Sequence, residues 1–337
     1  MPAEPILSVW NLRTYLRAKR GVVRAVDGVS LDLSVGEALG VVGESGSGKS
    51  VMARSIMGLV PSNAARSGEV LFKGRDLLSL SKKDAREVWG KQIAMVFQDP
   101  GRSLNPVVRV ERQLTEGMRK HLGTSRSEAH GKALNLLAEV GVPDPERRLR
   151  AFPHEMSGGM RQRVMIAVAL SAEPELLIAD EPTTALDVTV QRQILDLLRG
   201  VQKARGMSMM LISHDLAVVA GRTDRVAVMY AGKLAEMGTT QQVFGAPRHR
   251  YTTALFGATP KIDHERHAPF QIISGALPSP LAPPPGCRFA PRCSHAEPTC
   301  TEPGPTMTAV APGHVVSCIN PARATDAVRS GGEPDGR

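Results

Sequence analysis

The sequence predicts an α/β fold in which helices alternate with the strands of a mostly parallel sheet. Short apolar runs typical of buried strands recur along its 337 residues, and segments with helical patterns lie between them. Two of these runs end in unusual residues: a glycine-rich loop follows the run at 38–42, and two acidic residues follow the run at 176–179. The first of these loops has the composition of a phosphate-binding segment.

Residues 43–50 form a complete phosphate-loop motif, G-x-x-x-x-G-K-[ST], between the predicted strand at 38–42 and a predicted helix at 51–57. The motif residues are Gly43, Glu44, Ser45, Gly46, Ser47, Gly48, Lys49 and Ser50. Inward-pointing amides and the helix N-terminus suit the β-phosphate of a nucleotide. Lys49 can reach the β- and γ-phosphates, and the Ser50 hydroxyl can ligate Mg²⁺. The chain is therefore predicted to bind a nucleoside triphosphate, ATP, together with Mg²⁺.

The apolar run at 176–179 ends in Asp180 and Glu181. Asp180 suits the Mg²⁺ site as the strand-end acid of a phosphate-loop ATPase. Glu181 could polarise the attacking water as general base. An acidic pair at a strand end could also belong to a solvated loop, but the neighbouring segments 156–163 and 182–187 favour the catalytic interpretation.

The order of motifs resembles that of the ATP-binding subunits of ABC transporters over nearly the whole chain. In chain order these motifs are the phosphate loop, Gln98, Ser157-Gly158-Gly159, Asp180-Glu181, Asp187 and His214. The Ser-Gly-Gly signature is the specific part, because it separates these ATPases from other phosphate-loop proteins. The resemblance implies a P-loop ABC-type ATPase core with an antiparallel β subdomain and a helical subdomain.

The signature is expected to act on the ATP of a partner subunit. The resemblance places the Ser157 hydroxyl and the amides of Gly158 and Gly159 on that γ-phosphate, and it counts Asp187 among the nucleotide-binding residues. This copy of the signature ends in Met160, where the commoner form has Gln. Because the hydroxyl and the glycine amides are intact, we expect a working signature.

Three further side chains receive roles only from the resemblance. His214 would contact the γ-phosphate and help to hold the attacking water, although a lone histidine at a strand end is usually structural. Gln98 would sense Mg²⁺ and the γ-phosphate and link the core to the helical subdomain, although it could be an ordinary loop amide. Tyr15 is our candidate for the ring on adenine, with Leu16 as the alternative that would lose π-stacking.

The chain is expected to divide into an ATPase domain at 1–258, a Cys-rich C-terminal region at 259–324 and a disordered polar tail at 325–337. Strands of the β subdomain are expected within 6–33. A helical insertion is expected at about 102–163, where 128–140 carries a helical stripe of apolar residues.

All four cysteines lie in the C-terminal region, as Cys287, Cys293, Cys300 and Cys318. Clustered cysteines in a chain without a signal peptide suggest a metal site rather than disulfides. Four thiolates suit Zn²⁺ or a [4Fe–4S] cluster, and four structural thiols are the remaining alternative. The block resembles the C-terminal extension of the dipeptide/oligopeptide/nickel importer ATPases, and this resemblance favours the [4Fe–4S] cluster.

The net charge of +9 does not indicate nucleic acid. The segment 102–163 holds 12 Lys and Arg against 7 Asp and Glu, and Phe152 is its one aromatic residue, so base stacking lacks a platform. No apolar run reaches the ~18 residues of a membrane span, and the first residues lack the apolar core of a signal peptide. We therefore expect a peripheral protein on the cytoplasmic face of the bacterial inner membrane.

These observations predict one ATPase subunit of an ABC importer for dipeptides or oligopeptides. The resemblance implies a second, related ATPase subunit, two transmembrane permease subunits and an extracytoplasmic solute-binding protein. The alternatives are a similar subunit for nickel or another small solute, a soluble ABC ATPase of DNA repair or translation, and a metal-binding regulator with a vestigial ATPase fold. The chain lacks the coiled-coil insertion or second cassette usual in such soluble ATPases, and its complete motif set argues against the regulator.

Overall fold

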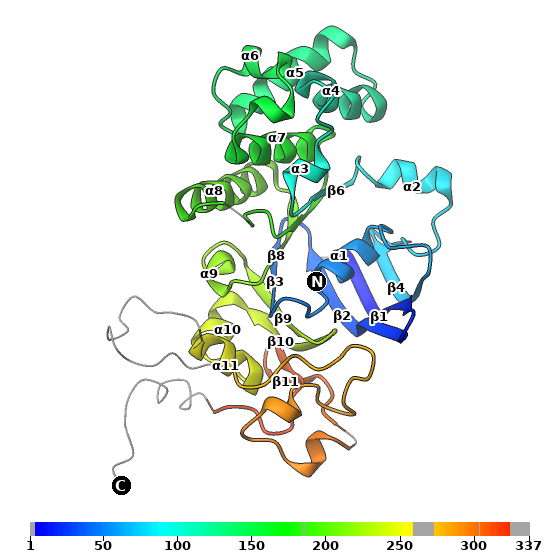
Figure 1. Ribbon diagram of the computed structural model, residues 1–337, viewed down its shortest axis with the longest axis vertical. Helices are drawn as coiled ribbons and strands as arrows, with labels where there is room; N and C mark the ends of the chain where they lie inside the picture. Colours follow the sequence, from blue (N-terminus) through cyan, green and yellow to red (C-terminus); the bar gives the residue numbers. More distant parts are fainter. Residues whose placement is uncertain (1–3, 185, 259–272, 303, 324–337) are drawn as a thin grey trace. The chain divides into compact units, whose positions relative to one another are not determined.

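A computed structural model describes residues 4–184, 186–258, 273–302 and 304–323 (Figure 1). The chain divides into two compact units. The first unit comprises Met1–Leu7, Leu33–Ala38 and Leu71–Ile212, and the second comprises Ser8–Asp32, Leu39–Val70 and Ser213–Arg337. The tail predicted to be disordered, 325–337, lies outside the described residues.

Three neighbouring strands form the buried sheet of the first unit. They are β6 (Ile93–Val96), β7 (Leu176–Asp180) and β8 (Ser208–Ser213). All three run parallel, with Leu176 opposite both Ile93 and Ser208. Every residue of these strands is buried, as expected for a parallel sheet covered on both faces. The predicted strand at 176–179 is confirmed, and it extends to the first of the two acids.

Side-chain caps or apolar residues at helical spacing mark the helices of the first unit. They are α2 (Lys82–Val88), α3 (Pro100–Ser103), α4 (Val110–His121), α5 (Arg126–Glu139), α6 (Pro145–Arg150), α7 (Gly158–Leu170) and α8 (Val188–Arg205), with a 3₁₀ turn at Pro153–Glu155. Helix α5 begins at a capping box between Ser125 and Glu128. Helix α4 buries Val110, Leu114 and Met118, one residue per turn. Helices α4 to α7 pack on one another in the segment predicted to be a helical insertion (Figure 1).

A mixed sheet lies in the second unit, in the order β11-β12-β10-β9-β3. Its strands are β3 (Ala38–Val42), β9 (Arg225–Tyr230), β10 (Lys233–Thr239), β11 (Thr308–Ala311) and β12 (His314–Val316). Strands β3 and β9 are parallel, with Val41 opposite Ala227, and the other pairs are antiparallel. The last two strands come from the Cys-rich region, so that region continues this sheet.

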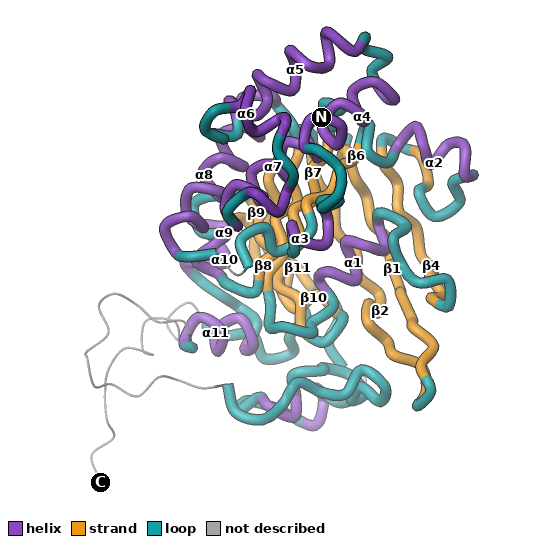
Figure 2. Tube along the Cα trace, turned by 45° about the horizontal axis from the view of Figure 1, so that its top comes forward, coloured by secondary structure: helices purple, strands orange, loops and turns teal. Residues whose placement is uncertain are grey.

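The remaining elements are a smaller sheet near the start of the chain and the helices of the second unit. A smaller sheet places β2 (Gly21–Ser34), β1 (Pro5–Ala18) and β4 (Ala64–Phe72) side by side (Figure 2), and the end of β4 pairs with β5 (Arg75–Asp76). The helices of the second unit are α1 (Lys49–Ile56), α9 (Leu216–Val219), α10 (Thr240–Gly245) and α11 (Arg250–Gly257), with 3₁₀ turns at Ala290–Arg292 and Pro298–Cys300. A buried hydrogen bond of 2.7 Å between the hydroxyls of Thr14 and Ser55 ties β1 to α1.

A buried polar cluster joins β12 to β10 and to the start of α11. Glu236 has no exposed surface, and its carboxylate accepts the backbone N–H groups of Arg248 and His249, each at 2.8 Å. Nε2 of His314 lies 2.7 Å from the same carboxylate. The ring of His249 caps α11 by accepting the N–H of Tyr251 at 3.0 Å. This buried carboxylate therefore has the partners that its desolvation requires.

Because of this buried cluster, we expect the folded chain to lose stability in mild acid. Burial lowers the pKa of His249 to about 4, although Glu236 acts in the opposite direction. The unfolded chain takes up this proton near pH 6.5 and the folded chain only near pH 4, so the free energy of unfolding falls as the pH falls through that window. Asn can keep the helix cap without titrating. Between pH 7 and pH 4.5, wild type should lose about 2–3 kcal/mol more stability than His249→Asn.

Urea unfolding of both proteins at a series of pH values measures this difference. The other titrating groups are common to both proteins and cancel in the comparison. Equal slopes of stability against pH would show that His249 does not carry the effect.

Candidate ATP site

The phosphate loop joins β3 to α1 within the second unit. Strand β3 is buried throughout, and α1 begins at Lys49, which places Ser50 in the first helical turn. The loop accepts only glycine at two positions. A Cβ on Gly43 would lie 2.1 Å from the carbonyl oxygen of Met229, and a Cβ on Gly48 would lie 2.3 Å from that of Ala25. Both glycines also have positive φ, which other residues rarely adopt.

Lys49 lies inside the loop with 3% of its surface exposed. Its ammonium group donates to the carbonyl oxygens of Gly43 at 2.7 Å and of Glu44 at 3.0 Å. The loop thus holds the charge that a phosphate-loop lysine offers to the β- and γ-phosphates. We expect the phosphate oxygens of bound ATP to replace these carbonyl groups as its partners.

In the first unit, Glu181 directly follows Asp180, the fully buried last residue of β7. Nε2 of Gln98 donates to Oε2 of Glu181 at 2.9 Å, and the hydroxyl of Thr184 donates to the same oxygen at 3.0 Å. Two of the predicted catalytic residues are therefore in contact. Thr184 is a further partner of Glu181 that sequence reasoning did not name as a site residue. Its Pro-Thr-Thr segment directly follows the acidic pair, and that position was the one sequence feature that pointed to it.

The backbone at Glu181 has a left-handed conformation, with φ of +47°. Its N–H donates to the carbonyl of Ile212 at 3.0 Å, which fixes the turn against the end of β8. A residue other than glycine held in this region costs roughly 1–3 kcal/mol and is common at functional sites. This conformation therefore supports a functional role for Glu181.

The signature residues begin α7, also in the first unit. Ser157 is the N-cap, with its hydroxyl accepting the N–H of Met160 at 3.3 Å, and both Ser157 and Gly158 are exposed. A Cβ on Gly159 would lie 3.1 Å from Val190, so this position favours glycine. An exposed helix N-terminus offers unpaired N–H groups and positive potential to an anion. Contact with the ATP of another subunit stays a prediction.

The structure also places three other predicted site residues. Asp187 is exposed and caps α8 by accepting the N–H of Val190 at 2.9 Å. His214 is exposed directly after β8. The hydroxyl of Tyr15 donates to Asp27 at 2.5 Å, and Asp27 also pairs with Arg288 of the Cys-rich region. Their contacts with nucleotide stay predictions.

The phosphate loop and the acidic pair belong to different units. The loop lies in the second unit with His214, and Gln98, Asp180 and Glu181 lie in the first. Joint binding of one Mg²⁺ and one ATP by Ser50 and Asp180 stays a prediction. The chemistry of the two groups fits it, because a hydroxyl and a carboxylate are oxygen ligands of the kind that Mg²⁺ takes.

The prediction of a [4Fe–4S] cluster is wrong. Across residues 273–302 and 304–323, and in the rest of the described chain, no three His, Cys, Asp or Glu side chains form a group that could hold a metal ion. The same finding gives no support to the zinc alternative. All four cysteines are free thiols. Burial raises the pKa of Cys287, Cys293 and Cys318.

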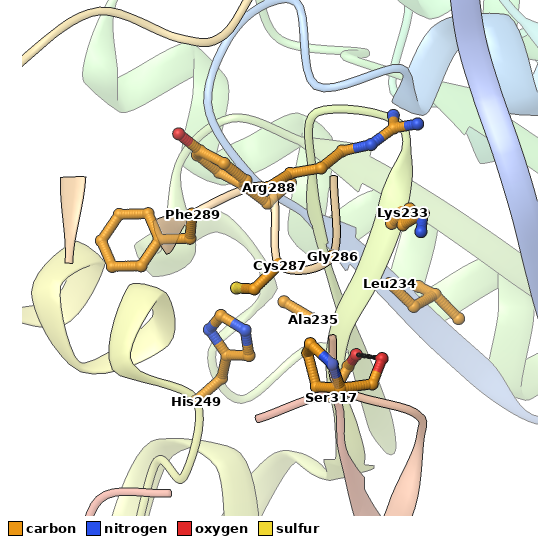
Figure 3. A pocket seen from close by; sticks show the side chains of 11 residues that line it. Lys233, Leu234, Ala235, His249, Gly286, Cys287, Arg288, Phe289 and Ser317 are labelled. Carbon is orange, nitrogen blue, oxygen red and sulfur yellow. Dashed lines mark hydrogen bonds between the residues drawn. The ribbon is translucent and has the colours of Figure 1, made fainter. Parts of the chain in front are cut away.

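A pocket of about 30 Å³ lies between β10 and residues 286–289, with Cys287, His249 and Ala235 in its wall (Figure 3). That volume suits about one water molecule. The metal prediction rested on the clustering of the cysteines and on the family resemblance. Beside Cys287 the region is packed by side chains, among them Phe289, whose ring lies 5.3 Å from that of Tyr230.

The fold and the site define a phosphate-loop ATPase, and comparison with known proteins shows which family it belongs to. Residues 26–184 match the family described as ABC transporter, and residues 235–300 match the one described as oligopeptide/dipeptide transporter, C-terminal region. The chain is 48% identical to the dipeptide transport ATP-binding protein DppD of Bacillus subtilis, covering 98% of this chain and 100% of that one. It is 45% identical to the oligopeptide transport ATP-binding protein OppD of Salmonella typhimurium, covering 95% of each.

Solved structures agree. A dimeric ATP-binding cassette in a post-hydrolysis state, bound to ADP and Pi, has a TM-score of 0.63 and 26% identity to this chain, and the match covers 69% of this chain and 98% of that one. The chain therefore belongs to the ATP-hydrolysing subunits of the ABC transporter family, in the group that carries the oligopeptide/dipeptide transporter C-terminal region.

Proposed function

We propose that this chain hydrolyses ATP to power the uptake of dipeptides or oligopeptides by an ABC importer. The observation that carries this function is the joining, in one chain, of an ABC-type ATP site and the oligopeptide/dipeptide transporter C-terminal region. Relatives named for dipeptide and oligopeptide transport match over nearly their full lengths, so the likeness is not confined to the ATPase core. Nickel or another small solute remains the alternative cargo.

The proposed complex contains two permease subunits, a solute-binding protein and a second ATPase subunit. No helix among the described residues is long and apolar enough to cross a membrane. Peripheral attachment to permeases at the cytoplasmic face of the inner membrane fits that finding. The solved dimeric cassette supports pairing of two ATPase subunits. We propose a related but different chain as the second one.

The finer division of the chain is also part of the proposal. Helices α4 to α6 lie within 102–163 and support a helical subdomain there. The sheet of β2, β1 and β4 supports a β subdomain at the start of the chain. An ATPase domain at 1–258 would then be followed by the C-terminal region at 259–324.

In the proposed hydrolysis each group of site residues has its own role. The phosphate loop would bind the β- and γ-phosphates, with Ser50 and Asp180 holding Mg²⁺, which offsets negative charge on the phosphates. Glu181 would accept a proton from the attacking water, while Gln98 and Thr184 orient its carboxylate at 2.9 Å and 3.0 Å. His214 would help to hold that water. Ser157, Gly158, Gly159 and Asp187 would serve the interface with the partner subunit.

Reconstitution tests the function. Alone, the chain should be mostly monomeric and weakly active, because half of each proposed ATP site comes from a second chain. In proteoliposomes with its permeases and second ATPase subunit, peptide-loaded binding protein should raise ATP turnover well above the level with unloaded binding protein.

Two results would contradict this proposal. Robust ATPase activity of the isolated monomer, independent of protein concentration, would rule out composite sites. Stimulation by nickel and not by peptide would replace the cargo.

A further inference from the structure

An arginine of the Cys-rich region reaches the phosphate loop within the second unit. The Arg292 side chain is 6% exposed, and its Nη1 lies 3.1 Å and 3.0 Å from the two carboxylate oxygens of Glu44. The same nitrogen donates to the hydroxyl of Tyr230 at 3.1 Å. Nε and Nη2 donate to the carbonyls of Ser274 and Ile273. Every nitrogen of the guanidinium group is thus engaged, so its position is fixed.

The backbone of Glu44 is held as well. Its N–H donates to the hydroxyl of Tyr251 at 2.9 Å, and Tyr251 is fully buried with its ring 4.5 Å from that of Tyr230. The backbone carbonyl of Glu44 accepts a hydrogen bond from the ammonium group of Lys49 at 3.0 Å. The residue that Arg292 holds is therefore a direct neighbour of the lysine that serves the phosphates.

A second contact connects the same two segments. A Cβ on Gly46 would lie 3.4 Å from Leu277, so the loop and the region after residue 272 are in close packing here. The phosphate loop is thus supported by residues more than 200 positions later in the chain. Sequence motifs could not reveal this support.

The charge of Glu44 gives Arg292 a specific task. A carboxylate in the phosphate loop repels the triphosphate of ATP, and the Glu44 side chain, with 26% of its surface exposed, is only partly screened by water. The buried guanidinium group offsets that charge and fixes the loop. A loop that spends less time in its binding conformation binds ligand proportionally more weakly.

We propose that Arg292 is a positioning residue of the ATP site, which neutralises Glu44 and keeps the phosphate loop ready for ATP. The Cys-rich region is then part of the nucleotide site. This inference rests on the assignment of the phosphate loop and does not depend on the transported solute.

A charge-rescue experiment tests the proposal on the full isolated chain, with a fluorescent ATP analogue and Mg²⁺. Arg292→Met keeps the length of the side chain and removes its charge, and it should raise the Kd about tenfold. Arg292→Lys should be intermediate, because one ammonium group cannot make all the contacts. Glu44→Gln alone should bind ATP at least as well as wild type. The double variant Glu44→Gln/Arg292→Met should recover most of the lost affinity.

Two controls separate positioning from general stability. Arg250 also anchors the Cys-rich region, with its Nε donating to the backbone carbonyl of Asn320 at 3.0 Å. Arg250→Ala should lower the unfolding temperature and leave the Kd unchanged. Lys49→Ala should abolish binding, and if it does not, the assignment of the phosphate loop itself fails.

Three results would overturn the proposal. The first is a Kd of Arg292→Met within about twofold of the wild-type value. The expected tenfold rise corresponds to about 1.4 kcal/mol of binding free energy. Another is a double variant that binds no better than Arg292→Met, which would leave only a structural role. If Arg292→Met does not fold, Glu44→Gln still decides, because a marked loss of affinity in that variant contradicts charge repulsion.

Discussion

Glu181→Gln should stop ATP hydrolysis and leave ATP binding intact. The amide has the shape of the carboxylate but cannot accept the proton of the attacking water, so turnover of the assembled complex should fall by at least ~100-fold. Its oxygen can still accept the hydrogen bonds of Gln98 and Thr184, both of which now go to one carboxylate oxygen. The variant should therefore accumulate as an ATP-bound closed dimer, visible by size-exclusion chromatography.

A matched control variant is available at Glu175, the residue directly before β7. Glu175 pairs with Lys73 at 2.8 Å on the surface of the first unit, away from the predicted site residues. Glu175→Gln makes the same chemical change and should keep wild-type turnover. If the Glu181→Gln complex also keeps wild-type turnover, Glu181 is not the general base.

Ser157→Arg should remove turnover of the ATP that this chain shares with its partner. The exposed start of α7 is the proposed contact with that γ-phosphate, and a long side chain there would hold the two subunits apart. Loss of one such preorganised donor typically costs ~10²–10³ in rate. Nucleotide binding at this chain's own phosphate loop should survive, and equilibrium binding to the isolated chain measures it.

Ser125→Arg is the control for this variant. Ser125 caps α5 as Ser157 caps α7, so both changes should cost about 1 kcal/mol of stability through the lost cap. Only the Ser157 variant should lose turnover. Equal loss in both would assign the effect to helix stability rather than to a composite site.

Local sequence was sufficient for the parts of the site whose geometry is local. The strand before the phosphate loop, the helix after it and the strand ending in Asp180 all follow from apolar runs, glycines and caps. The family resemblance assigned Gln98 to Mg²⁺ and the γ-phosphate, whereas its hydrogen bond to Glu181 is a finding of the structure. The left-handed backbone at Glu181 had no signal, because glutamate rarely adopts it.

The parts that sequence could not supply depend on tertiary packing. Tyr251 and Arg292 reach the phosphate loop from far along the chain, and no motif indicated that contact. The cysteines show the opposite error. Their clustering and the family resemblance indicated a shared metal site, but neither determines whether the side chains form a group that can hold a metal ion. In the folded chain burial favours the neutral thiol at Cys287, Cys293 and Cys318.

The pairing of β12 with β10 has a consequence for how this chain can be shortened. Strand β10 pairs with β9 on one side and with β12 on the other. A chain cut after α11 would leave β10 as an open edge strand, whose unpaired N–H and C=O groups invite pairing with a second molecule. It would also strip His314 from the buried Glu236. Fragments ending there would be prone to aggregation, so the C-terminal strands protect the ATPase sheet from self-association.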